Sequence, residues 1–325
     1  MEIYTRSFAI QFAPRANKKA TILGDCVRFS ILTPRLIRME YSPSSSFEDR
    51  PSQVFWYREQ PVPSFDVRRS EGCMSIETDH LFLQYLENEE GFTAKSLTVL
   101  LKNSGVEWRY GDNDPLNLRG TMRTLDGTDG ETGVDEGLIS RSGWSIWDDS
   151  TKMLFTPDGW LVPRNREEGY LDLYFFGYGH DYYGCLRDFS RVAGQAPVIP
   201  PWAWGTWWSR YWAYSGDEIL ALMDEFEARQ VPLAVCIVDM DWHIVDTGND
   251  SSGWTGYTWN RELFPNPPAF IADLHDRNLK VALNLHPAEG IHAHEEQYGQ
   301  MAKAMGVEPQ SKAPIPYAID DPQYT

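Results

Sequence analysis

The sequence predicts an N-terminal all-β sandwich followed by the first βα units of a (β/α)8 barrel. Three observations lead to this prediction. Short runs of alternating polarity fill residues 1–196, the period of the apolar residues changes after a cluster of prolines, and three later apolar runs each end in polar or ring-bearing residues. We therefore expect two domains, a sandwich over residues 1–196 and an incomplete barrel over residues 197–325.

The first domain reads as short strands that are separated by turn residues. The expected strands are 20–23, 26–33, 36–41, 74–76, 81–85, 97–101, 143–147, 152–155 and 170–176. Residues 111–138 are rich in Gly, Asp and Thr and predict a long loop, and residues 148–150 predict a turn. Strands at this spacing are typical of a β-sandwich.

The boundary between the two domains lies at Pro197, Pro200 and Pro201, because proline cannot donate to a strand ladder and favours a stiff linker. Beyond it the apolar residues take a helical period. Ser215 and Glu218 have the spacing of a capping box, which predicts a helix starting there.

The barrel domain contains parallel strands and helices in alternation. The expected strands are 202–212, 233–238, 279–287 and a short fourth at 315–319. Further helices are expected to start near residue 267 and to run over about 295–305. Three or four strands cannot close an eight-stranded barrel, so we expect the barrel to be cut off part-way round.

Polar residues follow the strands at the end where an α/β barrel carries its site. The second strand runs into Asp239, Asp241 and His243, and these three side chains share one face if the strand geometry continues. His243 is either a site residue or a histidine whose hydrogen bonds are satisfied at the end of the strand. The residues that follow the other two strands are Tyr211, Asn284 and His286.

The composition excludes several classes of partner and cofactor. A net charge of −18, from 47 acidic and 29 basic residues, argues against nucleic acid or an anionic membrane as a main partner. The four cysteines have no CxxC spacing, and His292 and His294 lack a third ligand at a suitable spacing, so we expect no metal and no cofactor. Neither a signal peptide nor a membrane-spanning run is recognised, and a cytoplasmic location is expected.

The ordered set of motifs resembles glycoside hydrolase family 31, the α-glucosidase and α-xylosidase family, over essentially the whole chain. The motifs are Arg38-Met-Glu-Tyr41 with Phe47-Glu-Asp-Arg-Pro-Ser-Gln53, Gly194 through Pro201-Trp-Ala-Trp-Gly205, Ser209-Arg-Tyr211, Asp239-Met-Asp241, and Gly253-Trp-Thr-Gly-Tyr-Thr-Trp259 with Leu263-Phe-Pro265. The resemblance implies a galactose-mutarotase-like sandwich and a barrel that hydrolyses terminal α-linked glycosyl residues with retention. The expected partner is therefore a carbohydrate.

The resemblance also implies roles for single residues. Asp239 matches the carboxylate that binds sugar hydroxyls in the −1 subsite, and Tyr211 matches an aromatic residue of that subsite. Met240 and Asn284 match positions in its wall. His286 stands where many members have Asp before Pro, so the substrate preference is expected to differ from that of a plain α-glucosidase.

A retaining mechanism needs two carboxyl groups about 5–5.5 Å apart, and these act from opposite faces of the scissile bond. Asp239 and Asp241 would approach from one side, so Asp241 is given a structural or supporting role. The resemblance implies that the nucleophile and the acid/base lie beyond Thr325, and that this polypeptide alone is inactive.

Two other hypotheses compete with the enzyme. One is a non-catalytic carbohydrate-binding or regulatory remnant of the same fold, although Asp239 and Tyr211 are still present. The other is a sandwich with mutarotase chemistry of its own, which would need His and Glu on strand faces. The only histidines in that region are His80 and His180, which argues against it.

Overall fold

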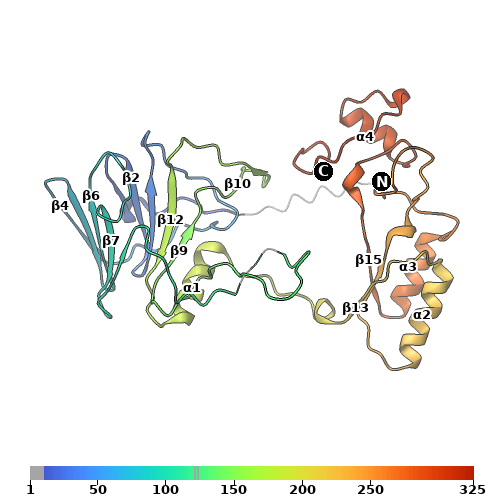
Figure 1. Cartoon of the computed structure of the whole chain (residues 1–325), viewed down its shortest axis with the longest axis horizontal. Helices are drawn as coiled ribbons and strands as arrows, with labels where there is room; N and C mark the ends of the chain where they lie inside the picture. The colour runs from blue at the N-terminus through green and yellow to red at the C-terminus, as the bar shows by residue number, and fades with distance from the viewer. Residues whose placement is uncertain (1–10, 121, 123) are drawn as a thin grey trace. The chain divides into compact units, whose positions relative to one another are not determined.

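The computed structural model describes residues 11–120, 122 and 124–325. Their contacts divide the chain into two compact units that meet between Ala196 and Pro197. Each unit has its own sheets (Figure 1). Each unit also has its own hydrophobic core.

Two antiparallel five-stranded sheets form the first unit (Figure 1). The first sheet has the order β1 (Thr21–Leu23), β2 (Val27–Thr33), β3 (Leu36–Tyr41), β12 (Leu171–Phe176) and β9 (Ser145–Asp148). The second has the order β4 (Phe65–Ser70), β5 (Cys73–Thr78), β6 (Leu81–Leu86), β7 (Leu97–Leu101) and β8 (Val106–Arg109). A separate pair is formed by β10 (Leu154–Phe155) and β11 (Leu161–Val162).

The main core of this unit lies between the two sheets. Phe29 and Met39 of the first sheet and Ile76, Leu83 and Val99 of the second are fully buried in one apolar cluster. Because alternate residues of a strand share a face, these positions form the inner side of each sheet. The predicted sandwich is confirmed.

The expectation that residues 1–196 are all-β is wrong for one element. Helix α1 (Tyr182–Ala193) begins at Asp181, whose side chain accepts a hydrogen bond from the backbone N–H of Gly184. Its Cys185 and Val192 are buried in a second cluster on the outer face of the first sheet. The helical spacing of these apolar residues was the signal that a reading based only on strands missed.

Strands β4, β8 and β11 were also absent from the prediction. In β4 only the first residue is even partly buried, and its sequence is Phe-Asp-Val-Arg-Arg-Ser. A strand of this kind has little apolar alternation and is therefore hard to recognise.

A layer of buried ion pairs lies on the outer face of the first sheet. Arg38 donates two hydrogen bonds of 2.7 Å to Asp172, and Arg164 donates to Asp172 at 2.7 Å and to Asp149 at 2.8 Å. The side chains of Arg38 and Asp172 are only 2% and 0% exposed. Burial opposes the charged form of Asp172, but Arg38 and Arg164 outweigh it and hold the pKa of that carboxyl well below its usual range. Asp149, predicted as part of a plain turn, is instead a fully buried member of this layer.

The second unit is built on three parallel strands in the order β13 (Trp207–Trp208), β14 (Val235–Val238) and β15 (Lys280–Leu283). Helix α2 (Gly216–Ala228) connects the first two strands and α3 (Pro267–Asp276) connects the last two (Figure 1). The predicted capping box is confirmed. The backbone N–H of Glu218 donates to Ser215 Oγ, and the backbone N–H of Ser215 donates to Glu218 Oε2.

Three boundaries in this unit differ from the prediction. The first strand keeps only two residues, because Pro201–Trp204 form a 3-10 turn before it. Helix α4 (Tyr298–Ala304) is shorter than expected. The fourth strand is absent from residues 315–319, where only Ile315 makes an isolated antiparallel bridge, to Ile291. Pro316 follows it and cannot donate to a ladder, which stops the pairing.

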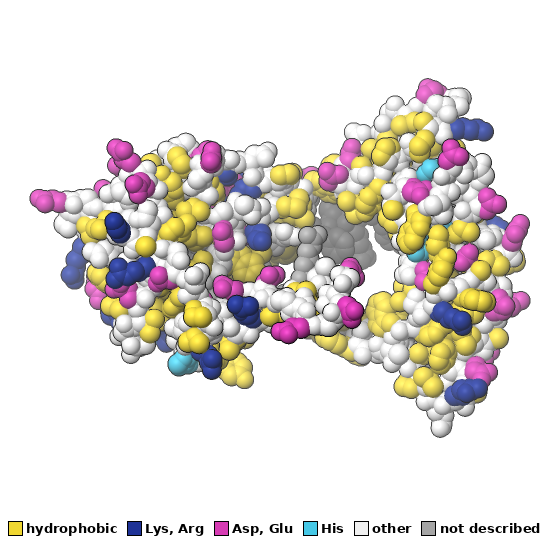
Figure 2. Space-filling model, in the orientation of Figure 1, with side chains coloured by type: hydrophobic (Ala, Val, Ile, Leu, Met, Phe, Trp, Pro, Cys, Tyr) yellow, Lys and Arg dark blue, Asp and Glu magenta, His cyan; other side chains and the backbone are white. Residues whose placement is uncertain are grey.

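The remaining short 3-10 helices lie in turns. They are η1 (Lys18–Ala20), η3 (Met240–Trp242), η4 (Pro287–Glu289) and η5 (Pro309–Ser311). None of the helices in the described ranges has both the length and the apolar character needed to span a bilayer. Acidic side chains are spread over the visible face of each unit rather than gathered in one patch (Figure 2).

We predict that Asp172→Asn destabilises the first unit by about 3–5 kcal/mol, because it leaves buried guanidinium groups without their counter-charge. Urea unfolding of the chain, followed by tryptophan fluorescence, measures this change. Glu77→Gln is the matched control, since Glu77 pairs with Lys102 at a solvent-exposed site and its loss should change little. An Asp172→Asn protein as stable as the wild type would contradict a stabilising role of the layer.

Candidate active site

The candidate site begins where β14 ends. The carboxylate of Asp239 accepts a hydrogen bond of 2.8 Å from the backbone N–H of Met240, and Asp239 thereby caps the 3-10 turn η3. The strand geometry therefore does not continue through His243. The expectation that Asp239, Asp241 and His243 share one strand face is wrong, because the chain turns at Asp239.

Strand pairing places Asn284 beside Asp239. Val238 is the register partner of Leu283, and the backbone N–H of Asn284 donates to the carbonyl of Val238 at 3.0 Å. The Asn284 side chain then donates to Asp239 Oδ1 at 3.1 Å, and His286 Nε2 lies 3.5 Å from the same oxygen. Among the described residues, no donor reaches Asp239 Oδ2, so that oxygen keeps its full capacity to accept hydrogen bonds.

His243 and His286 form a contacting pair behind this carboxylate. His243 is fully buried, with Nδ1 3.2 Å from the carbonyl of Ile244 and Nε2 3.1 Å from His286 Nδ1. Burial lowers the pKa of His243, although its bond to the Ile244 carbonyl acts in the opposite direction. His243 is thus a hydrogen-bonded histidine at the strand end, and it also contacts His286, a candidate site residue. Its role in the site stays a prediction.

The segment 253–259 folds back over this pair. Trp254 meets the ring of His286 edge-on, with 4.9 Å between ring centroids. Gly256 lies so close to the His243 ring that an added Cβ would be 2.2 Å from His243 Cδ2. Glu295 holds the segment from the other side, accepting hydrogen bonds from Thr255 Oγ1 and the backbone N–H of Tyr257.

The other predicted residues lie in different surroundings. Met240 is buried in η3, and Asp241 in the same turn is partly buried. Tyr211 is 70% exposed, and within the described ranges its side chain makes no hydrogen bond. The structure therefore brings Asp239, Asn284, His286 and His243 together, while the role of Tyr211 stays a prediction.

Two residues of the 253–259 motif were not predicted to be part of the site. Trp254 supports His286, and Gly256 makes room for His243. The sequence signal for this contact was a glycine flanked by Trp254 and Tyr257. A glycine lets another ring approach the backbone at a distance that a side chain would block.

His292 and His294 lie near each other, with 6.4 Å between ring centroids. Nε2 of His294 is 3.2 Å from Glu295, its neighbour in sequence. No group of three or more His, Cys, Asp or Glu residues in the described part of the chain is arranged to hold a metal ion.

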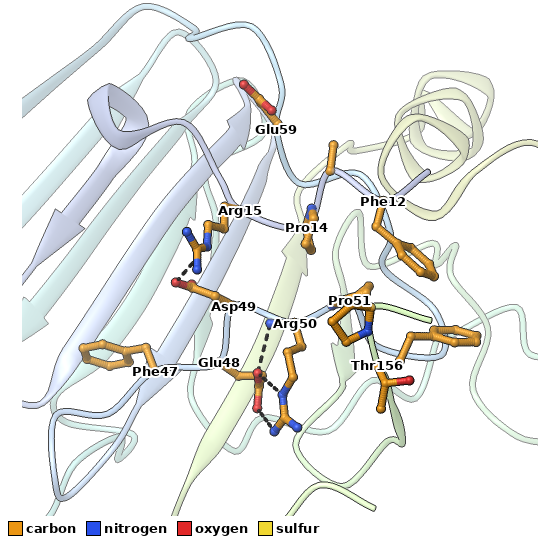
Figure 3. Close-up of a pocket in the computed structure, with 13 residues that line it drawn as sticks. Phe12, Pro14, Arg15, Phe47, Glu48, Asp49, Arg50, Pro51, Glu59 and Thr156 are labelled. Carbon is orange, nitrogen blue, oxygen red and sulfur yellow. Dashed lines mark hydrogen bonds and ion pairs between the residues drawn. The ribbon is translucent and has the colours of Figure 1, made fainter. Parts of the chain in front are cut away.

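A pocket of about 590 Å³ lies on the sandwich unit, between Phe12, Phe47 and Phe155, and none of the candidate residues lines it (Figure 3). Four of its charged groups pair with one another, since Arg50 binds Glu48 at 2.9 Å and Arg15 lies 3.5 Å from Asp49, while Glu59 is a fifth charged group in the lining. The pocket therefore offers few free polar groups, and we place the candidate site at the strand ends instead.

The comparisons with known proteins fit this geometry. Residues 196–314, which contain the site, match the sequence model of the glycosyl hydrolases family 31 TIM-barrel domain. Over residues 196–314 the chain is therefore similar to the barrel domain of glycosyl hydrolase family 31. The match agrees with the parallel sheet of the second unit, in which the assembled site residues follow β14 and β15 at one end.

Two curated glycosidases match part of the chain. An α-xylosidase of Saccharolobus solfataricus is 26% identical over 181 residues, which cover 54% of this chain and 23% of that protein. An α-glucosidase of Bacillus thermoamyloliquefaciens is 28% identical over 117 residues, covering 36% of this chain and 14% of that protein. The chain thus matches less than a quarter of the length of either relative.

The fold likeness extends over both units. The crystal structure of an α-xylosidase from Xanthomonas citri has a TM-score of 0.61 at 12% identity, with 93% of this chain and 51% of that chain covered. At this identity the likeness shows the fold alone, which is a β-sandwich followed by part of a TIM barrel.

We predict that Gly256→Ala destabilises the second unit by about 1–3 kcal/mol, because the new methyl group overlaps the His243 ring. Thermal unfolding measures the change. Gly299→Ala, in the exposed face of α4 with nothing within 4 Å, is the control and should stabilise by up to about 1 kcal/mol. Equal effects of the two changes would argue against a close contact at Gly256.

Stability should also depend on pH through His243. Its lowered pKa means that the unfolded chain binds this proton more readily, so stability falls as the pH drops below the ordinary value of 6.5. The slope has an upper limit of about 1.4 kcal/mol per pH unit for each proton. Urea unfolding of the wild type and of His243→Gln over this pH range should show a shallower slope in the variant, and identical slopes would contradict the prediction.

Proposed function

We propose that this chain forms the N-terminal sandwich and the first barrel strands of a retaining α-glycosidase that acts on terminal α-linked glycosyl residues. The observation that carries the proposal is the carboxylate of Asp239 at the end of β14. Its Oδ1 is fixed by Met240 and Asn284, and its Oδ2 accepts no bond within the described ranges. A fixed, charged acceptor at a barrel strand end suits the binding of sugar hydroxyls.

The geometry supports a substrate-binding role for Asp239 rather than a catalytic one. Asp239 and Asp241 both belong to the turn that follows β14, so they would approach a sugar from the same side. Retaining hydrolysis uses carboxyl groups on opposite sides of the bond. We therefore infer that the nucleophile and the acid/base are not among residues 197–325, and that this chain alone does not turn over a glycoside.

The names of relatives suggest the range of substrates. The curated relatives are described as α-xylosidases and α-glucosidases, and we propose a glycone of this neutral class. His286 would contact that glycone next to Asp239, because its Nε2 lies 3.5 Å from Asp239 Oδ1. The cytoplasmic location stays a prediction.

Hydrolysis of a panel of aryl α-glycosides tests the proposal, with this chain measured beside a version extended through further barrel strands. We expect turnover only in the extended protein. In that protein Asp239→Asn should lower kcat/KM about 100-fold, since a hydrogen bond to a charged group contributes about 1.5–3 kcal/mol. The matched control, Asp241→Asn, should cost less than about tenfold.

Two results would contradict the proposal. Hydrolysis by this chain alone would mean that a carboxylate pair within it performs the chemistry. An extended protein that binds sugars without hydrolysing any α-glycoside would favour the alternative, a carbohydrate-binding or regulatory relative of the same fold.

A further inference from the structure

The donors and acceptors around His243 fix the position of its proton. A carbonyl oxygen can only accept, so the 3.2 Å contact between His243 Nδ1 and the Ile244 carbonyl requires the proton on Nδ1. His243 is fully buried, and burial favours its neutral form, which carries one N–H. Its Nε2 is therefore a hydrogen-bond acceptor.

This assignment determines the state of the neighbouring ring. The contact of 3.1 Å between His243 Nε2 and His286 Nδ1 needs a donor, and only His286 Nδ1–H can supply it. The other nitrogen of His286 lies 3.5 Å from Asp239 Oδ1, beyond the usual range for an N–H donor to oxygen. At that distance the contact is not a normal hydrogen bond, so it does not by itself require a proton on Nε2.

We propose that His243 is a positioning residue that holds His286 in its Nδ1–H tautomer, so that His286 Nε2 is left as a hydrogen-bond acceptor for the ligand. The acceptors offered to a ligand are then Nε2, which lies 3.5 Å from Asp239 Oδ1, and the Oδ2 atom of the same carboxylate. Such a pair is complementary to two neighbouring hydroxyl groups of one sugar ring, both of which donate. The contact between His286 and a sugar rests on the proposed function. The tautomer of His286 does not, because it follows from the contacts of His243 alone.

The surroundings of the pair leave His243 little freedom to turn. One side of its ring is closed by Gly256, where an added Cβ would lie within 2.5 Å of three ring atoms. Trp242 packs edge-on against it at 5.4 Å, and Trp254 packs edge-on against His286 at 4.9 Å. Because both rings are held by packing, the carbonyl of Ile244 can determine the proton position two hydrogen bonds away.

NMR of the chain labelled with ¹⁵N in histidine tests the tautomer directly. Long-range ¹H–¹⁵N correlations distinguish protonated from unprotonated ring nitrogens, and the His286 signals are assigned by their loss in His286→Gln. In the wild type at mildly alkaline pH we expect His286 to be protonated at Nδ1 only. The exposed His275 of α3 is the internal reference for a histidine without fixed partners.

Two variants of His243 test whether this residue sets the tautomer of His286 or only supports the fold. His243→Phe keeps a ring but removes the acceptor, and the His286 proton should move to Nε2, where it can donate to Asp239. His243→Gln keeps a side-chain oxygen that can accept, and it should preserve the Nδ1–H tautomer. A wild-type His286 protonated at Nε2, or on both nitrogens, would overturn the inference even if neither variant folds.

The sugar contact is tested by adding methyl α-D-xylopyranoside or methyl α-D-glucopyranoside to the same sample. Binding detected by tryptophan fluorescence should shift the His286 Nε2 resonance and leave Nδ1 protonated. Binding without that shift would overturn the acceptor role. Absence of any sugar binding would count against the proposed function, while the tautomer of His286 would still decide the role of His243.

Discussion

Parallel pairing between β14 and β15 is the interaction on which the candidate site depends. Val238 pairs with Leu283, so the next residues, Asp239 and Asn284, lie at the same edge of the sheet. The hydrogen bond from the backbone N–H of Asn284 to the Val238 carbonyl is the last bond of this pairing. A slip of one residue would send the two side chains to opposite faces. The polar chemistry of the site is thus a consequence of apolar strand packing, since Cys236 and Val238 of β14 are buried between the sheet and its helices.

The two units obtain their stability in different ways. The second unit packs α2 and α3 on one small parallel sheet through a conventional apolar cluster. The first sheet of the sandwich has an apolar inner face, but its outer face carries Arg28, Arg38, Glu40 and Asp172 at neighbouring register positions. Charges at such depth are tolerated only when each has a partner, and Arg38 and Asp172 bind each other through two parallel hydrogen bonds.

Much of the fold could be predicted from the sequence because local patterns were clear. Alternation along residues 36–41 predicted β3, and the pair Ser215 and Glu218 predicted the start of α2. The prediction failed where local pattern and tertiary pairing disagree. The apolar residues at 315–319 resemble a strand, but Pro316 prevents its ladder, and the charged β4 is a strand only because β5 pairs with it.

The candidate site shows a similar division. The sequence predicted Asp239, Asn284 and His286 as site residues, because each follows an apolar run that reads as a buried strand. The contact between His243 and His286 was not visible, since these residues are 43 positions apart and meet only after the segment 253–259 has folded over them. Gly256 was missed for the same reason, because its importance lies in the space that it leaves empty.

The charge of the site bears on the neutral glycone that we propose. Asp239 supplies a carboxylate, and burial lowers the pKa of His243, which disfavours a positive charge on that ring. The whole chain carries a net charge of −18, so an anionic sugar would meet unfavourable potential both on approach and at Asp239. Hydroxyl donors would bind these partly buried acceptors without such a cost, which supports our proposal of an uncharged sugar over one with an acidic substituent.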